Sequence, residues 1–337
     1  MIVITLQPNK CYNYHLIAMK VLAFLKEWSL AVSLCVGTII YLLFSKIDVL
    51  QPVGDWVGPK CVSLMPVVLF VLLYVTFCKI EIKEMKPRVW HFLLQAIRTT
   101  LAALAVLAVN LTHDPTLKLI FEGVFICVIC PTAAAAAVVT EKLGGSIGSL
   151  TTYTIIANMV TMVIIPLFFP MVEKGADISF LTAATMVFRN VTTVLVLPLL
   201  LALLTRRFLP RFARAVKSKK NLGFYLWCFN LSIVTGLTIR NITHAQVSGS
   251  VLAILLILPL FITIAQFGIG KLVGRPFGAS ISAGQALGQK NTVVGIWLTI
   301  TFLNPLAAVA PGAYVIWQNL VNAWQIWYKD KYGQLRW

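Results

Sequence analysis

The stretch FGASISAGQALGQKNTVVGIWLTITFL, residues 277–303, decides the fold of this chain. It is long and apolar enough to cross a bilayer as a helix, but its centre, Gly288 to Thr292, is rich in glycine and polar side chains. A charged side chain in the hydrocarbon costs several kcal/mol, so Lys290 is expected to face a cavity or a partner within the protein. We therefore predict a spanning helix that is broken in its middle.

A second stretch, EGVFICVICPTAAAAAVVTEKLGG at residues 122–145, carries another predicted break. Pro131 removes a backbone donor and clashes with the preceding turn, so the helix should be interrupted near Cys130 to Thr132. Backbone groups freed at this depth are tolerated only where they line a cavity or are buried in protein. Half-helix N-termini near Thr132 and Asn291 would direct positive dipole ends towards an anion. The alternative is a single kinked helix with a packed glycine seam.

Composition places the rest of the chain in the membrane as well. Of its 337 residues, 59% are hydrophobic and 12% are charged, a balance outside the range of soluble domains. The apolar runs have the length of membrane-spanning helices. We predict ten spans, at 28–46, 60–79, 90–111, 117–142, 146–171, 180–205, 222–240, 248–270, 276–303 and 307–328.

The number of spans predicts an internal symmetry. Five spans per half is an odd number, so a repeated half must enter the membrane with the opposite orientation. The predicted fold class is an all-α membrane protein of ten transmembrane helices in two inverted five-helix repeats, with discontinuous helices four and nine crossing. The expected segments are an N-terminus 1–27 with a candidate native start at Met19, a first repeat 28–171, a stretch 172–221 that includes span six and the basic linker 206–221, a second repeat 180–328, and a tail 329–337.

The net charge of +17 is interpreted as membrane topology rather than as a nucleic-acid surface. Lysine and arginine concentrate at both termini and in the even-numbered loops, which predicts that both termini are cytoplasmic. The expected location is a bacterial inner membrane. The densest basic cluster lies between spans six and seven, at 206–220. We interpret it as a topological anchor, with a lipid-sensing role as the alternative.

Three basic residues fall inside predicted spans and away from the span ends: Arg98, Arg189 and Lys290. Each requires a cavity or a partner, and Glu122 is the expected partner of Lys290 or Arg98. Arg189 could instead form a structural ion pair. A lysine that is unpaired for part of the time could also carry a proton.

The seven cysteines are scattered and imply no disulfide framework. Cys127 and Cys130 form a CxxC with no second pair or histidine close by, so no metal site is expected and no cofactor is implied. No HExxH motif or serine dyad is present, and the four histidines fall near span ends or outside the spans. The sequence therefore does not predict an enzyme.

The two motif regions resemble the bile acid:sodium symporter family. Residues 288–325, GQKNTVVGIWLTITFLNPLAAVAPGAYVIWQNLVNAWQ, are similar to its ninth and tenth helices, and residues 130–145, CPTAAAAAVVTEKLGG, to its first crossover motif. The resemblance implies a panel domain of spans one, two, six and seven and a core domain with the crossed helices. It also implies organic anions that are moved together with sodium.

The resemblance carries over to individual residues, with departures. Thr154 matches a sodium-binding threonine, and Asn319 a substrate-side asparagine. The candidate substrate-binding residues are Thr132, Ala133, Asn291, Thr292, Gln318 and Asn319, and the candidate charge or coupling residues are Lys290, Arg98, Glu122 and Thr154. Gln95 is the alternative to Arg98 as the match to a sodium-site glutamine.

The departures concern sodium. Ala136 and Ala137 replace a serine–asparagine pair, and Ala286 and Lys290 replace a glutamate and a glutamine. Sodium requires a cage of hard oxygen ligands, so sodium is not expected as a partner. We predict a secondary transporter of a small organic anion that works by alternating access, with sodium coupling lost or replaced by a fixed lysine or a proton. The alternatives are a membrane ligand sensor that does not transport, or an arsenite- or auxin-type exporter of the same superfamily.

Overall fold

A computed structural model describes residues 24–25, 27–173, 181–182, 185, 188–189, 192–219 and 221–335. Regular structure in these residues is entirely helical, without a strand. The candidate start at Met19 and part of the predicted span 180–205 lie outside them. The elements are α2 (Ser29–Lys46), α3 (Gln51–Phe77), η1 (Ile82–Glu84), α4 (Val89–Leu111), α5 (Pro115–Ile129), α6 (Ala136–Leu143), α7 (Ile147–Val172), η2 (Thr192–Val196), α9 (Leu197–Phe208), α10 (Pro210–Ser218), α11 (Leu222–Thr243), α12 (Gly249–Gly274), η3 (Arg275–Phe277), α13 (Ser280–Gly288), α14 (Thr292–Phe302), η4 (Pro305–Ala308) and α15 (Val309–Tyr332).

The structure contains helices long enough for a bilayer. In the described residues six helices are long and apolar enough to cross a membrane, and a seventh candidate joins Thr192–Phe208 to Pro210–Ser218 across a 119° bend. The predicted second span began too late, since α3 starts at Gln51. Pro52 lies in the first helical turn, where its missing N–H is not needed, and the interior Pro59 and Pro66 do not end the helix.

Both predicted breaks are present. The helix α5 ends at Ile129 and α6 begins at Ala136, while α13 ends at Gly288 and α14 begins at Thr292. Neither stretch is a single kinked helix. The half-helix that follows the first break, α6, begins later than expected, at Ala136. Ala133 to Ala135 form a turn that precedes it.

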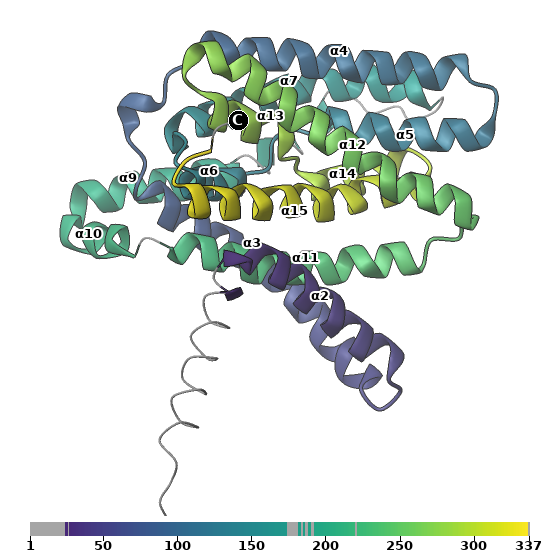
Figure 1. Cartoon of the computed structure of the whole chain (residues 1–337), viewed down its shortest axis with the longest axis horizontal. Helices are drawn as coiled ribbons and strands as arrows, with labels where there is room; N and C mark the ends of the chain where they lie inside the picture. The colour runs from purple at the N-terminus through teal and green to yellow at the C-terminus, as the bar shows by residue number, and fades with distance from the viewer. Residues whose placement is uncertain are drawn as a thin grey trace, which may run out of the picture.

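The helices pack in two groups. The helices α2 and α3 pack against α11, and α9 packs against α3, whereas α12 packs against α13 and α15, and α4 against α5 and α7. The hairpin of α2 and α3 projects away from the other helices (Figure 1). The interrupted helices lie within the second of these groups, with α4, α7, α12 and α15.

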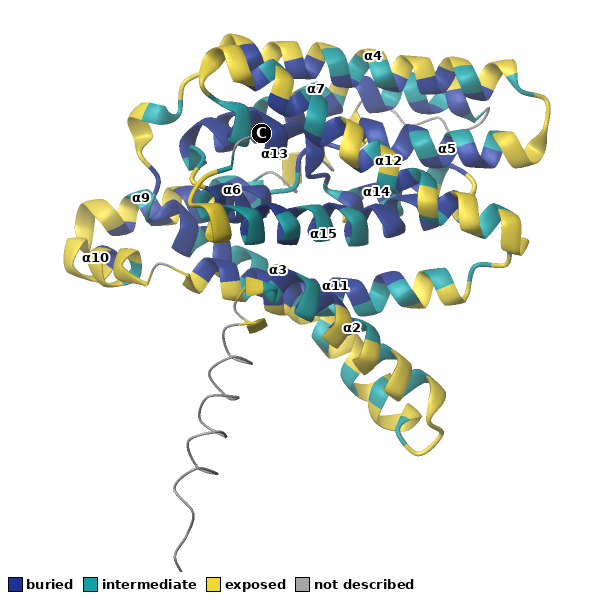
Figure 2. Cartoon of the chain, in the orientation of Figure 1, coloured by how far each residue is buried: buried dark blue, intermediate teal, exposed yellow. Residues whose placement is uncertain are grey.

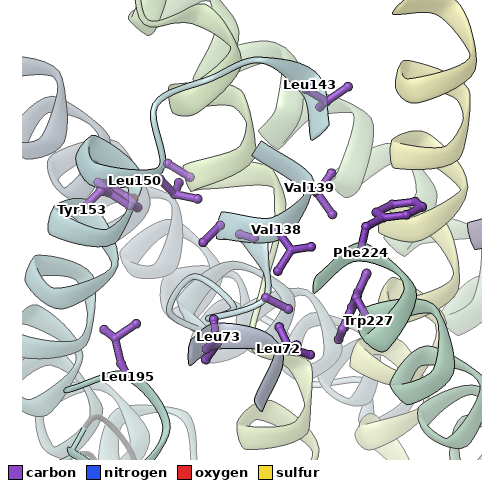
Figure 3. Close-up of a cluster of buried hydrophobic side chains, with 14 of the residues drawn as sticks. Leu72, Leu73, Val138, Val139, Leu143, Leu150, Tyr153, Leu195, Phe224 and Trp227 are labelled. Atoms are coloured by element: carbon purple, nitrogen blue, oxygen red, sulfur yellow. The ribbon is translucent and has the colours of Figure 1, made fainter. Parts of the chain in front are cut away.

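An apolar cluster holds the short helix α6 in place. Figure 3 shows Val138 and Val139 of α6 among Leu72 of α3, Tyr153 of α7 and Phe224 of α11. A helix of eight residues has little stability of its own, so this packing is what holds it. The cluster connects α6, the half of the first interrupted helix that follows the break, to both groups of helices.

Burial follows the same arrangement. Buried residues predominate along α6, α13 and α15, while α2, α3 and α10 have many exposed positions (Figure 2). Large apolar side chains lie on the outer surface, among them Leu107 and Ile257, which are 52% and 50% exposed. An apolar exterior of this extent is what a lipid-facing surface requires.

Candidate functional site

The two breaks pair with each other through their backbones. The N–H of Ala133 donates to the carbonyl of Gln289 at 3.1 Å, and the N–H of Asn291 donates to the carbonyl of Pro131 at 2.8 Å. Thr132 and Lys290 are thereby joined in an isolated antiparallel bridge. This pairing satisfies backbone groups that the interruptions free from helical bonds.

Side chains cap the three carbonyls at the end of α5. Gln266 of α12 donates from Nε2 to the carbonyl of Cys127 at 3.2 Å. The ammonium of Lys290 donates to the carbonyl of Val128 at 3.0 Å. The guanidinium of Arg98 donates from Nη1 to the carbonyl of Ile129 at 3.2 Å. A helix C-terminus carries partial negative charge, so two cations at this position are favourable.

Arg98 also connects three elements. Its Nη1 donates to Thr161 Oγ1 at 3.0 Å and its Nη2 donates to the carbonyl of Ala157 at 3.1 Å, both on α7. Arg98 itself lies on α4 and is 1% exposed, as is Lys290. In the part of the chain that the structure describes, neither basic side chain forms an ion pair with a carboxylate. The crossing, where the two breaks meet, therefore buries two basic side chains whose described partners are carbonyl and hydroxyl oxygens.

The second break is held by side chains in a similar way. Tyr314 donates its hydroxyl to the carbonyl of Gly288 at 2.8 Å, and Thr132 donates to the carbonyl of Ala286 at 2.5 Å. Gln318 of α15 accepts from the backbone N–H of Lys290 at 2.8 Å and faces its carbonyl from Nε2 at 3.5 Å. The first break is thus held by Lys290, α4 and α12, and the second break by Thr132 and α15.

The predicted substrate-binding residues gather at this crossing to different degrees. Thr132 and Ala133 belong to the paired breaks, and Asn291 and Thr292 stand at the start of α14. Asn319 on α15 is fully buried, and its Nδ2 donates within its own helix to Val315 while its Oδ1 has no protein partner.

Thr154 bonds within its own helix. Its Oγ1 donates to the carbonyl of Leu150 at 2.9 Å, and the residue is 3% exposed. The hydroxyl proton is therefore already used inside α7, and nothing in the structure joins this side chain to Lys290 or Arg98.

The expected partnership of Glu122 with Lys290 or Arg98 is wrong. Glu122 instead accepts from the backbone N–H of Asn304 at 3.2 Å, beyond the end of α14. It borders a cavity of about 400 Å³ together with Lys118 and Glu173, which form their own ion pair at 2.5 Å. Glu122 lies on α5 about two turns from its C-terminal carbonyls, so the helix itself separates this carboxylate from the cations.

The structure also locates Gln95 and Arg189, two further residues named from the sequence. Arg98, rather than Gln95, donates to the first break, and Gln95 is buried one turn earlier with neither amide atom bonded to the protein. Arg189 is exposed at the protein surface rather than buried as Arg98 and Lys290 are. Cys127 and Cys130 are buried free thiols, and the described residues contain no cluster of metal-ligating side chains.

Sequence reasoning missed Gln266, Tyr314 and Thr161, which bond to the two breaks or to Arg98. Each is a polar side chain inside an otherwise apolar helix. That pattern was visible in the sequence, because a polar group in hydrocarbon needs an internal partner. The group to which each side chain would bond depended on how the helices pack.

The helical fold, its apolar exterior and the buried polar crossing define an integral membrane protein. A model of the sodium bile acid symporter family matches residues 66–245, more than half of the chain, and the chain belongs to this family. Members of this family are transporters rather than enzymes. The matched region includes the first break but not the second. No curated protein matches the chain.

Proposed function

We propose that this protein is a secondary active transporter of a small organic anion and works by alternating access across a bacterial inner membrane, with both termini cytoplasmic. The proposal includes the ten-span arrangement of two inverted repeats. Two interrupted helices that meet through their backbones support that arrangement, because such helices form the central sites of inverted-repeat transporters.

One observation carries the choice of an anion. Arg98 and Lys290 are buried at the crossing without a carboxylate within reach in the described structure. A buried charge without a counter-charge is costly, and an anionic substrate would lower that cost. The start of α14 at Thr292 adds a positive dipole end at the same crossing.

Sodium is replaced by Lys290 in this proposal. Ala136, Ala137 and Ala286 offer a cation no side-chain oxygen. The carbonyl oxygens at the end of α5 already accept from Gln266, Lys290 and Arg98. A fixed ammonium on those carbonyls supplies the positive charge that a bound ion would otherwise bring, and loss of its proton would allow coupling to pH.

The test uses the purified protein with a panel of small carboxylates and sulfonates, first by thermal shift and then by uptake into proteoliposomes. Lys290→Met and Lys290→Gln should remain folded and lose anion affinity at least about tenfold, since a charged hydrogen bond contributes about 1.5–3 kcal/mol. Lys290→Arg should retain part of the affinity. Glu122→Gln is the control, because its carboxylate bonds elsewhere.

The outcomes are distinguishable. Lysine variants that bind anions as the wild type does would overturn the role of Lys290. Anion binding without uptake would indicate a ligand sensor on the same fold. The measurement of binding thus separates the site from the transport activity.

A further inference from the structure

A second cavity lies apart from the crossing, at the junction of α3, α6, α10 and α11. Its volume is about 420 Å³, and its wall includes Lys79, Glu141, Lys142, Lys217, Asn221 and Phe224. Lys217 of this wall belongs to the basic segment 206–219, and α10, which carries it, lies beside α9 at one end of the molecule (Figure 1). The proposed anion site at the crossing does not use any of these residues.

Positive charge is in excess in this cavity. Lys79 and Glu141 form an ion pair at 2.9 Å, which uses the single carboxylate of the wall. Lys142 and Lys217 have no ion pair with a carboxylate in the described residues. The ammonium of Lys142 lies 5.5 Å from the ring centroid of Phe224, so a wall residue positions it.

The N-terminus of α11 adds to this field. Asn221 and Phe224, which border the cavity, are the N-cap and the third residue of this 22-residue helix. Asn221 makes no side-chain cap bond. The N–H of Leu222 donates to the carbonyl of Lys219 at 3.3 Å. The N–H groups of Gly223 and Phe224 have no acceptor within the helix, and the positive end of the helix dipole favours an anion.

We propose that this cavity binds a phosphate group, either as inorganic phosphate or as the headgroup of an anionic phospholipid. Inorganic phosphate and a phosphodiester headgroup both offer strong acceptor oxygens and negative charge in a compact group. It would suit two ammonium groups that approach from different helices together with a helix N-terminus. Lys142 belongs to α6 and Lys217 to α10, so the bound group would bridge those helices.

The bridge has a mechanical consequence. The helix α6 is one half of the first interrupted helix, and α10 leads into α11, which packs with α2 and α3. A ligand between α6 and α10 would therefore restrict movement of the interrupted helix relative to that group. Occupancy of this cavity would regulate the transport cycle, although the binding claim does not depend on transport.

The experiment compares the wild type with Lys142→Gln/Lys217→Gln, with Lys217→Gln and with Lys219→Gln. The last removes one charge, as Lys217→Gln does, at an exposed residue that does not border the cavity. Thermal shift in neutral detergent is measured with sodium phosphate against sodium chloride at equal ionic strength. A parallel series uses short-chain phosphatidylglycerol against phosphatidylcholine. The single variant Lys217→Gln, at an exposed position, is included in case the double variant does not fold.

We expect stabilisation of the wild type and of Lys219→Gln, with affinity about fivefold weaker for each cavity lysine removed. A response to phosphate alone assigns a free anion, and a response to phosphatidylglycerol alone assigns a lipid headgroup. The proposal is overturned if the wild type responds to neither ligand. It is equally overturned if the cavity variants respond as strongly as Lys219→Gln does, since the effect would then be general surface charge.

Discussion

The ammonium nitrogen of Lys290 lies 3.0 Å from the backbone carbonyl oxygen of Val128. The lysine comes from the break in the second interrupted helix and the carbonyl from the last turn of α5. This bond therefore joins the two broken segments, in addition to their backbone pairing. The charge is directed at the negative end of a helix, not at Glu122. This bond stabilises the end of α5, and in the proposed function the same side chain supplies positive charge at the crossing.

Arg98→Met should destabilise the protein strongly. The change removes three hydrogen bonds, to Ile129, Thr161 and Ala157. The carbonyl of Ala157 keeps the hydroxyl of Thr161 as a donor, but the buried carbonyl of Ile129 at the end of α5 loses its donor, at a cost of about 1–3 kcal/mol. Arg189→Met is the control, because that arginine is exposed. Thermal unfolding of the purified variants checks this, and equal Tm values for the two variants would contradict a structural role of Arg98.

Tyr314→Phe should lower stability by about 1–2 kcal/mol, because it removes the hydroxyl that donates to the carbonyl of Gly288 while the ring remains. Tyr225→Phe makes the same chemical change at an exposed ring, 46% accessible, and should have little effect. The two Tm values are compared in the same detergent. No difference between them would mean that the carbonyl of Gly288 finds another donor.

Gly270→Ala should lower stability although alanine favours a helix. An added Cβ would lie 2.4 Å from the carbonyl oxygen of Ala283, so α12 and α13 would have to separate, at a cost of about 1–3 kcal/mol. Gly268→Ala meets nothing within 4 Å and should be neutral or stabilising by up to about 1 kcal/mol. Opposite signs of the Tm change in this pair test the close contact directly.

Anion binding and uptake should not change when sodium is replaced by potassium. Ala136, Ala137 and Ala286 lack side-chain oxygens, and protein donors already occupy the carbonyls at the end of α5. Binding is measured at constant ionic strength with the two salts. A saturable sodium dependence in the millimolar range would show that backbone carbonyls and Thr154 form a cation site.

Most of the helix boundaries could be predicted, because apolar runs of membrane length are read directly from the sequence. The start of α3 was missed because a proline such as Pro59 favours a helix boundary, whereas the folded helix continues through it. The charge partners could not be predicted. Glu122 and Lys290 were the obvious pair by sign, but pairing depends on distance, which the helical path of α5 determined.

The sequence by itself determined that this chain belongs in a bilayer and where two of its helices break. Those properties depend on local chemistry: apolar length, the missing N–H of Pro131 and the polar residues around Lys290. Only the tertiary structure decided that the breaks pair through Thr132 and Lys290, and that Arg98 reaches Ile129. Such contacts join residues far apart in the chain, and their geometry follows from how the helices pack rather than from any local preference.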